Sequence, residues 1–220
     1  MDVVFCFDCE GTEPQIRAVA EMAESHDVPL TIFAVGETAR SYPALFRELS
    51  RFHEVHTHSD RHLRHRGMAK KKQRELIRAG RACIEDLLGR PVTGFRAPFH
   101  SIDRATVEIL NEEKFLFDAS GLYHRYDMGN VRELRPSWFR EWAPWYPWIG
   151  LNPDRAFSIF RWLAKRRELL VLPVHPHYTG AAEENLAAFG KLLGGLKELG
   201  GRHYGGEALV RAQLERRDPG

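Results

Sequence analysis

The sequence predicts an α/β fold built around a parallel β-sheet. Short apolar runs alternate along the chain with longer amphipathic segments, in which apolar residues recur at three- and four-residue spacing. This alternation is typical of a wound sheet or a barrel, because parallel strands need a crossover between them and the crossover is usually a helix. The chain has 220 residues, 43% of them hydrophobic, which is enough for a sizeable core. We expect residues 1–220 to form a single domain.

The order of the expected elements follows from the spacing of these runs. The strands are short apolar runs, and the helices are amphipathic segments, as the apolar positions of residues 76–88 illustrate. Strands and helices alternate, and each strand precedes one helix. The expected strands are Val3–Phe7, Leu30–Val35, Glu54–Thr57, Val92–Phe95, Phe115–Asp118 and Leu169–Val174. The helices that follow them, in the same order, are Pro14–Ser25, Glu37–Arg51, Ala69–Leu88, Asp103–Glu113, Asp154–Arg167 and Ala182–Leu199.

Composition excludes several classes of protein. With 32 basic and 30 acidic residues, the formal net charge of +2 gives no bulk attraction to nucleic acid, so we expect no nucleic-acid partner. No apolar run approaches the length of a membrane-spanning helix. The first twelve residues contain neither the basic segment nor the apolar core of a secretion signal, and three cysteines are an odd number for a disulfide framework. We therefore expect a cytoplasmic protein.

Two carboxylates come directly after the first expected strand. In such folds, functional residues gather at the carboxyl ends of the strands. Side chains alternate along an extended chain, so Asp8 and Glu10 share one face while Cys9 points to the other. One carboxylate could act as a base and the other as a metal ligand, or both could belong to a solvated loop. Cys6 and Cys9 form a C-x-x-C pair, but their opposite faces and the lack of a second pair disfavour redox chemistry.

The densest chemical feature is a cluster of histidines that follows the third expected strand. Five of the eleven histidines lie between His53 and His65. His58 and His62 are four residues apart, which on a helical turn places both imidazoles on one side, where Zn²⁺ can take two nitrogens. Two histidines and one carboxylate would leave open positions for water and substrate. The alternative is a polar surface loop in which the histidines have no common role.

Two further strand ends carry polar residues. Arg96 follows the fourth expected strand and could pair with a carboxylate and keep it ionised, although an ordinary surface arginine is the alternative. His175 and His177 follow the most apolar strand, where a histidine is a candidate general acid or a structural residue. Asp118 ends the fifth strand and is a candidate for orienting His175.

A proline-rich stretch, residues 138–148, holds four of the five tryptophans and is predicted to form a long loop. It could stack on sugar rings, contact a membrane interface, or pack as a lid on the core. The sequence leaves these three roles open.

Taken together and in this order, these segments resemble the polysaccharide deacetylase family, the NodB-homology domain of carbohydrate esterase family four. His58-Ser-Asp-Arg-His62 is similar to the H-[ST]-x-x-H core of that family. Leu30–Gly36 is similar to its second strand, Arg96-Ala-Pro-Phe99 to its R-x-P-[YF] motif, and Leu172-Pro-Val-His175 to its L-x-x-H motif. The first motif departs from the common T-F-D-D: Cys6-Phe-Asp-Cys-Glu10 resembles a D-x-[DE] variant.

The resemblance implies a fold, a reaction and a set of catalytic residues. The fold would be a distorted (β/α)₇-type barrel, and the reaction would be hydrolysis of an N-acyl group, N-acetyl above all, on an amino sugar or glycan. The implied roles are general base for Asp8, orientation of Asp8 for Arg96, and protonation of the leaving amine for His175. Pro98, Phe99 and Trp145 are the residues expected to contact the substrate.

The resemblance also implies one divalent metal ion, Zn²⁺ before Co²⁺ or another ion, bound by Glu10, His58 and His62. A Cys9 thiolate in place of Glu10 is the alternative ligand. His56 stands where the family usually has a small glycine, so we expect the rim of the pocket to be crowded or more basic.

Three alternatives to a glycan substrate or an active enzyme remain. The first is a deacylase or deformylase of a small cytosolic amide, favoured by the crowding expected from His56. The second is a lipid-linked sugar substrate, which would bring the protein to a membrane and is suggested by the tryptophan stretch and Lys70–Lys72. The third is a catalytically dead relative that only binds carbohydrate. Retention of the implied catalytic residues argues against this third alternative.

Overall fold

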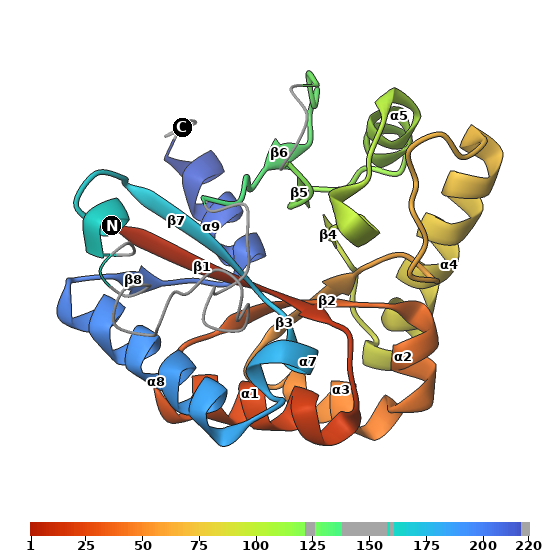
Figure 1. The fold of residues 1–220 in the computed structure, drawn as a ribbon. Helices are drawn as coiled ribbons and strands as arrows, with labels where there is room; N and C mark the ends of the chain where they lie inside the picture. Colours follow the sequence, from red (N-terminus) through yellow and green to blue (C-terminus); the bar gives the residue numbers. More distant parts are fainter. Residues whose placement is uncertain (122–125, 138–157, 159–160, 217–220) are drawn as a thin grey trace.

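The computed structural model describes residues 1–121, 126–137, 158 and 161–216. Within them, all strands join one sheet in the order β6-β5-β4-β3-β2-β1-β7, with β8 paired to β1, and every pairing is parallel. Figure 1 shows the sheet curled into an open half-barrel with helices around it. The expected parallel α/β architecture is therefore confirmed.

The strands and helices have the following bounds. The strands are β1 Asp2–Cys9, β2 Leu30–Ala34, β3 Glu54–Thr57, β4 Gly94–Phe95, β5 Phe117–Asp118, β6 Arg132–Glu133, β7 Leu169–Val174 and β8 Arg202–His203. The helices are α1 Glu13–Ser25, α2 Gly36–Ser41, α3 Pro43–Leu49, α4 Lys70–Leu88, α5 Arg104–Glu112, α7 Pro176–Thr179, α8 Glu183–Glu198 and α9 Gly206–Glu215, with a 3₁₀ turn at Pro98–His100.

Most expected elements are present, with differences that have local causes. The predicted single helix over residues 37–51 is wrong: the chain breaks into α2 and α3 at Tyr42, whose φ of −128° and ψ of 56° are not helical. Pro43 follows, and proline disfavours the helical conformation in the residue before it. Strands β6 and β8 and helix α9 were not predicted. Most of the expected helix over residues 154–167 lies outside the described residues.

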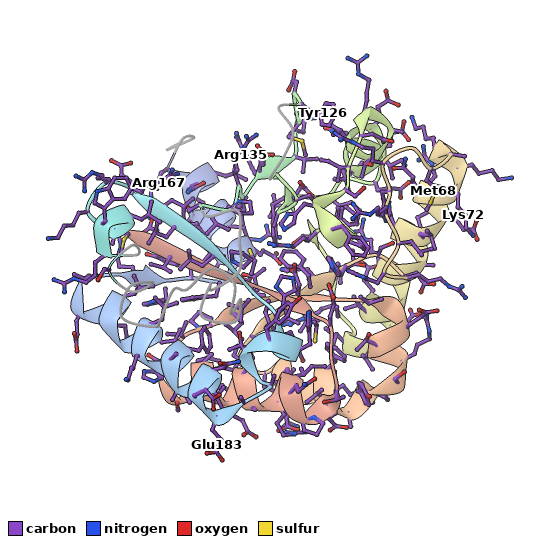
Figure 2. The ribbon with its side chains drawn as sticks, in the orientation of Figure 1. Met68, Lys72, Tyr126, Arg135, Arg167 and Glu183 are labelled. Atoms are coloured by element: carbon purple, nitrogen blue, oxygen red, sulfur yellow. The ribbon has the colours of Figure 1, made fainter. Side chains whose placement is uncertain are left out.

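The two faces of β1 enter different hydrophobic clusters. Phe5, Phe7 and Cys9 belong to an outer cluster that also contains side chains of α1, α3 and α8. Val4 and Cys6 belong to an inner cluster with Val171 of β7 and with Leu209 and Val210 of α9. Figure 2 shows side chains filling the space between the sheet and its helices. Because side chains alternate along a strand, the residues that continue the inner face beyond Cys6 are Asp8 and Glu10.

Helix α9 is fixed against the inner face near the amino ends of the strands. Glu54, the first residue of β3, accepts hydrogen bonds from the backbone N–H groups of Glu207 and Ala208, at 2.8 and 2.9 Å. The Thr31 hydroxyl of β2 accepts a third from Gly206, at 2.7 Å. These acceptors satisfy the first N–H groups of the helix, which have no partner within it. Helix α9 therefore covers the inner face toward the amino ends of the strands, the side opposite to Asp8 and Glu10.

None of the described helices is both long enough and apolar enough to cross a membrane.

Three partly or fully buried histidines predict a loss of stability in acid. Burial lowers the pKa of His53, His65 and His203 from 6.5 to about 4, because the charged form is disfavoured inside the protein. Below pH 6.5 the unfolded chain therefore binds protons that the folded chain does not. Stability present above pH 6.5 is lost as pH falls toward 4, by at most about 3 kcal/mol for each histidine.

Asp118 acts in the opposite sense over the same range. Burial raises its pKa from 3.8 to about 7, so its contribution to stability is present below pH 3.8 and is lost as pH rises toward 7. It offsets about one of the three histidines. We expect the melting temperature, measured by differential scanning calorimetry, to fall between pH 6.5 and 4.5, and to fall less in His53→Gln. A constant melting temperature over this range would contradict the assignment.

Candidate functional site

Four parallel strands deliver polar side chains to one place at their carboxyl ends. Asp8 and Glu10 come from the end of β1, and His58 follows β3 directly. Arg96 follows β4, and His175 follows β7. The structure therefore brings together residues that lie up to 167 positions apart in the chain, from Asp8 to His175.

Glu10, His58 and His62 form a group with the geometry of a metal site. One oxygen or nitrogen of each lies within 4.8 Å of the others. Oε1 of Glu10 is 2.7 Å from Nε2 of His62 and 3.7 Å from Nε2 of His58. Both Nε2 atoms are buried and face the Glu10 carboxylate, so the three donor atoms point to one place. Two imidazole nitrogens and a carboxylate oxygen suit Zn²⁺ or a similar divalent ion.

The backbone orients His58 for this role. Its Nδ1–H donates to the carbonyl oxygen of Arg96 at 2.8 Å, so Nε2 carries the free lone pair and faces Glu10. Such a bond to the other ring nitrogen is the usual way in which a metal-binding histidine is held. The following loop packs closely on α4, where a Cβ on Gly80 would lie 2.4 Å from the carbonyl carbon of Ser59. Glycine is therefore required at position 80 for the loop to reach this position.

Asp8 lies beside Glu10, His58 and His62 (the metal-type group), held between Arg96 and His175. It is 3% exposed, and its Oδ1 forms an ion pair with Nε of the fully buried Arg96 at 2.8 Å. Its Oδ2 is 3.3 Å from Nε2 of His175. Burial alone would raise the pKa of Asp8, but Arg96 and His175 outweigh it and hold the pKa well below its usual range. Asp8 is therefore an ionised, buried carboxylate, which is the state a general base needs.

Glu10 is also kept ionised. Burial alone would raise the pKa of Glu10. The adjacent imidazoles of His58 and His62 outweigh this effect, so the net pKa lies well below the usual range for glutamate. His177 adds a second contact: its Nδ1–H donates to the Glu10 carbonyl oxygen at 3.3 Å. Sequence reasoning noted His177 only as a neighbour of His175 and did not connect it with Glu10.

Cys9 takes no part in this group. It belongs to the outer hydrophobic cluster and is fully buried. Burial raises the pKa of its thiol well above the usual value, and the nearby Asp8 and Glu10 carboxylates add to this effect, so a thiolate is disfavoured. Among the described residues, Glu10 supplies the carboxylate beside the two histidines.

The Arg96–His100 segment forms a strained turn beside the site. Phe99 has φ of 57° and His100 has φ of 53°, in the left-handed region that favours glycine. Phe99 is 45% exposed, its ring lies 4.3 Å from that of His62, and the guanidinium of Arg64 covers it at 4.5 Å. Pro98, the other expected substrate contact in this segment, is buried. Trp145, with the rest of residues 138–148, lies outside the described residues.

Two expectations about neighbouring residues are wrong. His56 does not crowd the pocket rim: it is 2% exposed, its Nδ1 accepts from the Gly94 N–H at 3.2 Å, and its ring packs on Phe117. Asp118 does not orient His175, because its two oxygens accept from the hydroxyl and the N–H of Ser120, at 2.6 and 3.0 Å. Both errors arise because sequence gives the end of a strand but not the direction of each side chain there.

Comparison with known proteins gives one family and one fold. The sequence profile of the polysaccharide deacetylase family matches residues 2–116. A chitooligosaccharide deacetylase from Azorhizobium caulinodans is 26% identical over 113 residues, which are 50% of this chain and 53% of that protein. The aligned part thus spans about half the length of that curated relative.

Solved structures resemble the whole chain at low sequence identity. A candidate polysaccharide deacetylase from Mycobacterium smegmatis has a TM-score of 0.79 at 22% identity, covering 97% of this chain and 91% of that one. Puue allantoinase has a TM-score of 0.83 at 16% identity, covering 100% and 91%. A wild-type family 4 pseudoenzyme from Bacillus anthracis has a TM-score of 0.72 at 17% identity, covering 95% and 65%. These likenesses confirm the predicted distorted (β/α)₇-type barrel.

Proposed function

The chain belongs to the polysaccharide deacetylase family, and we propose that it is a metal-dependent hydrolase that removes an N-acyl group, N-acetyl above all, from an amino sugar or glycan. One observation carries the proposal. An ionised, buried carboxylate with an arginine and a histidine on its two oxygens stands beside a group of one carboxylate and two imidazoles. Hydrolysis of an unreactive amide needs both parts, one to activate water and one to receive its proton.

Glu10, His58 and His62 would hold the metal ion, with Zn²⁺ as our first choice and Co²⁺ or another divalent ion as the alternative. When bound there, the ion would lower the pKa of a water molecule and polarise the acyl oxygen. The fit rests on the donor set and on the two buried imidazole nitrogens that face the Glu10 carboxylate.

Asp8 is the proposed general base. It takes a proton from the attacking water as the oxygen of that water bonds to the acyl carbon. Arg96 holds the carboxylate in place through the 2.8 Å contact between Nε and Oδ1 and keeps it ionised before the reaction. Arg96 is fully buried, and its guanidinium can only donate hydrogen bonds, which suits it to hold a carboxylate.

His175 is the proposed general acid. It donates a proton to the nitrogen of the leaving amine as the bond between carbon and nitrogen breaks, since an unprotonated amine is a poor leaving group. The 3.3 Å separation between His175 Nε2 and Asp8 Oδ2 then allows the proton taken from water to pass from Asp8 to His175. One water is consumed, one amide is cleaved, and both residues return to their starting states.

Phe99 is the proposed substrate platform. Its exposed ring lies against His62 and beneath Arg64, so a sugar ring stacked on it would place a substituent near the metal-type group. Pro98 lies buried within the same turn and would shape it. Trp145 remains a proposed substrate contact on sequence grounds alone.

The test is acetate release from N-acetylglucosamine oligomers of increasing length by the purified protein supplied with Zn²⁺ or Co²⁺. We expect release that depends on added metal ion and stops in a chelator. Release from short amides alone would move the substrate to the small-amide alternative, which the likeness to an allantoinase over the whole chain makes the second candidate. Oligomer binding without any release would indicate a non-catalytic relative.

We expect His175→Ala to lower kcat for the amide by about 10²- to 10⁴-fold, with little change in KM, because the amine would leave unprotonated. Hydrolysis of an aryl acetate should fall far less, since a phenolate leaves without a proton. Kinetics with both substrates check this, with His26→Ala, at the end of α1, as the control. Equal losses on amide and ester would contradict the general-acid role.

A further inference from the structure

His100 contacts the arginine that holds the proposed base. Nη2 of Arg96 lies 3.1 Å from Nε2 of His100. A guanidinium can only donate hydrogen bonds, so His100 must accept here, and its ring must be neutral with its proton on Nδ1. Arg96 is thereby fixed at three points: Nε faces Asp8, Nη2 faces His100, and its carbonyl oxygen accepts from His58.

Two features of His100 are unfavourable for folding. Its φ of 53° lies in the left-handed region, directly after Phe99 at 57°, where glycine would be free of strain. Its Nδ1 is buried and has no hydrogen-bond partner among the described residues. Histidine is therefore unfavourable here on backbone grounds, since glycine adopts this conformation without strain. Strain of this kind points to a role beyond packing.

We propose that His100 is a positioning residue that holds the Arg96 guanidinium against Asp8. In its absence, Nη2 of Arg96 would lack an acceptor and the guanidinium would be free to turn away from the carboxylate. The effect on catalysis passes through Arg96, and it rests on the proposed function of Asp8 as general base. The contact between His100 and Arg96 does not itself depend on that function.

Three variants separate positioning from packing. His100→Gln keeps an acceptor that can reach Nη2, His100→Leu keeps the bulk without an acceptor, and His100→Gly removes both while relieving the strain. We expect kcat to stay within about threefold in the glutamine variant. In the leucine and glycine variants we expect it to fall about tenfold or more, with KM and metal content unchanged. In the glycine variant, relief of the strain should offset part of the stability lost with the imidazole contact.

Lys114→Gly is the matched control for relief of strain. Lys114 also has a positive φ, 55°, but lies at the end of α5, before β5, away from the carboxyl ends that carry the site. The Lys114→Gly substitution should raise the melting temperature without changing kcat. Wild-type kcat in both His100→Leu and His100→Gly would overturn the proposal, as would losses of kcat that merely follow losses of melting temperature.

A second readout does not depend on activity. The Nε–H resonance of Arg96 in ¹⁵N NMR spectra, identified by its loss in Arg96→Lys, should be sharp in the wild type and in His100→Gln. In His100→Leu and His100→Gly it should shift and exchange faster with solvent. If the wild type releases no acetate but these spectra change as expected, the proposed function fails while the positioning role stands. Unchanged spectra in all variants would overturn the positioning role itself.

Discussion

Replacing Asp8 with asparagine should lower kcat by about 10²- to 10⁴-fold while leaving KM and metal content close to those of the wild type. Asparagine matches the shape of aspartate but cannot accept a proton at neutral pH. The ionised carboxylate is stabilised here by Arg96 on one oxygen and His175 on the other, and the amide would keep neither charge interaction. The expected loss is therefore in the chemical step.

Asp2→Asn is the matched control for this prediction. Asp2 lies at the opposite end of β1 and also pairs with an arginine, Nη2 of Arg202, at 2.7 Å. Removing its charge breaks an ion pair on the same strand without touching the site, so kcat should not change. Steady-state kinetics on an N-acetylglucosamine oligomer provide the measurement. If Asp8→Asn kept wild-type kcat, another group would have to receive the proton from water.

The alternation of side chains along β1 was enough to predict part of the site. The period of two in a strand is enough to place Asp8 and Glu10 on one face and Cys9 on the other. In the structure, Val4 and Cys6 lie in the inner cluster, and Cys9 lies in the outer one. Strand β7 was predicted with its observed bounds for a different reason: its six residues form a continuous apolar run, which is typical of a parallel strand buried on both faces.

Short strands and turn conformations could not be predicted in the same way. Strands β6 and β8 have two residues each, too few to show a period, and unlike the equally short β4 and β5 they do not lie in apolar runs. The left-handed turn at Phe99 and His100 breaks the expectation that such backbone needs glycine. His100 was missed for this reason: its contact with Arg96 depends on a conformation that residue type disfavours.

His56 shows how a resemblance can mislead at a single position. The family usually has a small residue there, and the resemblance led to the expectation that the larger side chain crowds the pocket rim. Instead, Gly94 on the next strand leaves room for the ring: a Cβ on Gly94 would lie 2.8 Å from Cγ of His56. The larger side chain of His56 thus occupies the space that a side chain at position 94 would fill. The two residues are neighbours only because β3 pairs with β4.

Replacing Glu10 with alanine should remove the metal ion, and with it all metal-dependent activity. We expect about one Zn²⁺ per chain in the wild type by elemental analysis, and far less in Glu10→Ala and His58→Ala, because each loses one of three ligands. Cys9→Ala is the matched control, since it tests the alternative ligand on the adjacent residue. It should keep its metal ion, because the thiol lies in the outer cluster.

Thermal unfolding gives the same answer without any substrate. Binding to the folded state alone stabilises the protein by about 2.7 kcal/mol when free Zn²⁺ is a hundredfold above Kd. Added Zn²⁺ should therefore raise the melting temperature of the wild type and of Cys9→Ala but not that of Glu10→Ala. The reverse pattern, with the shift lost in Cys9→Ala and kept in Glu10→Ala, would assign the ligand to the thiolate. It would also require β1 to turn its last residue toward the inner face.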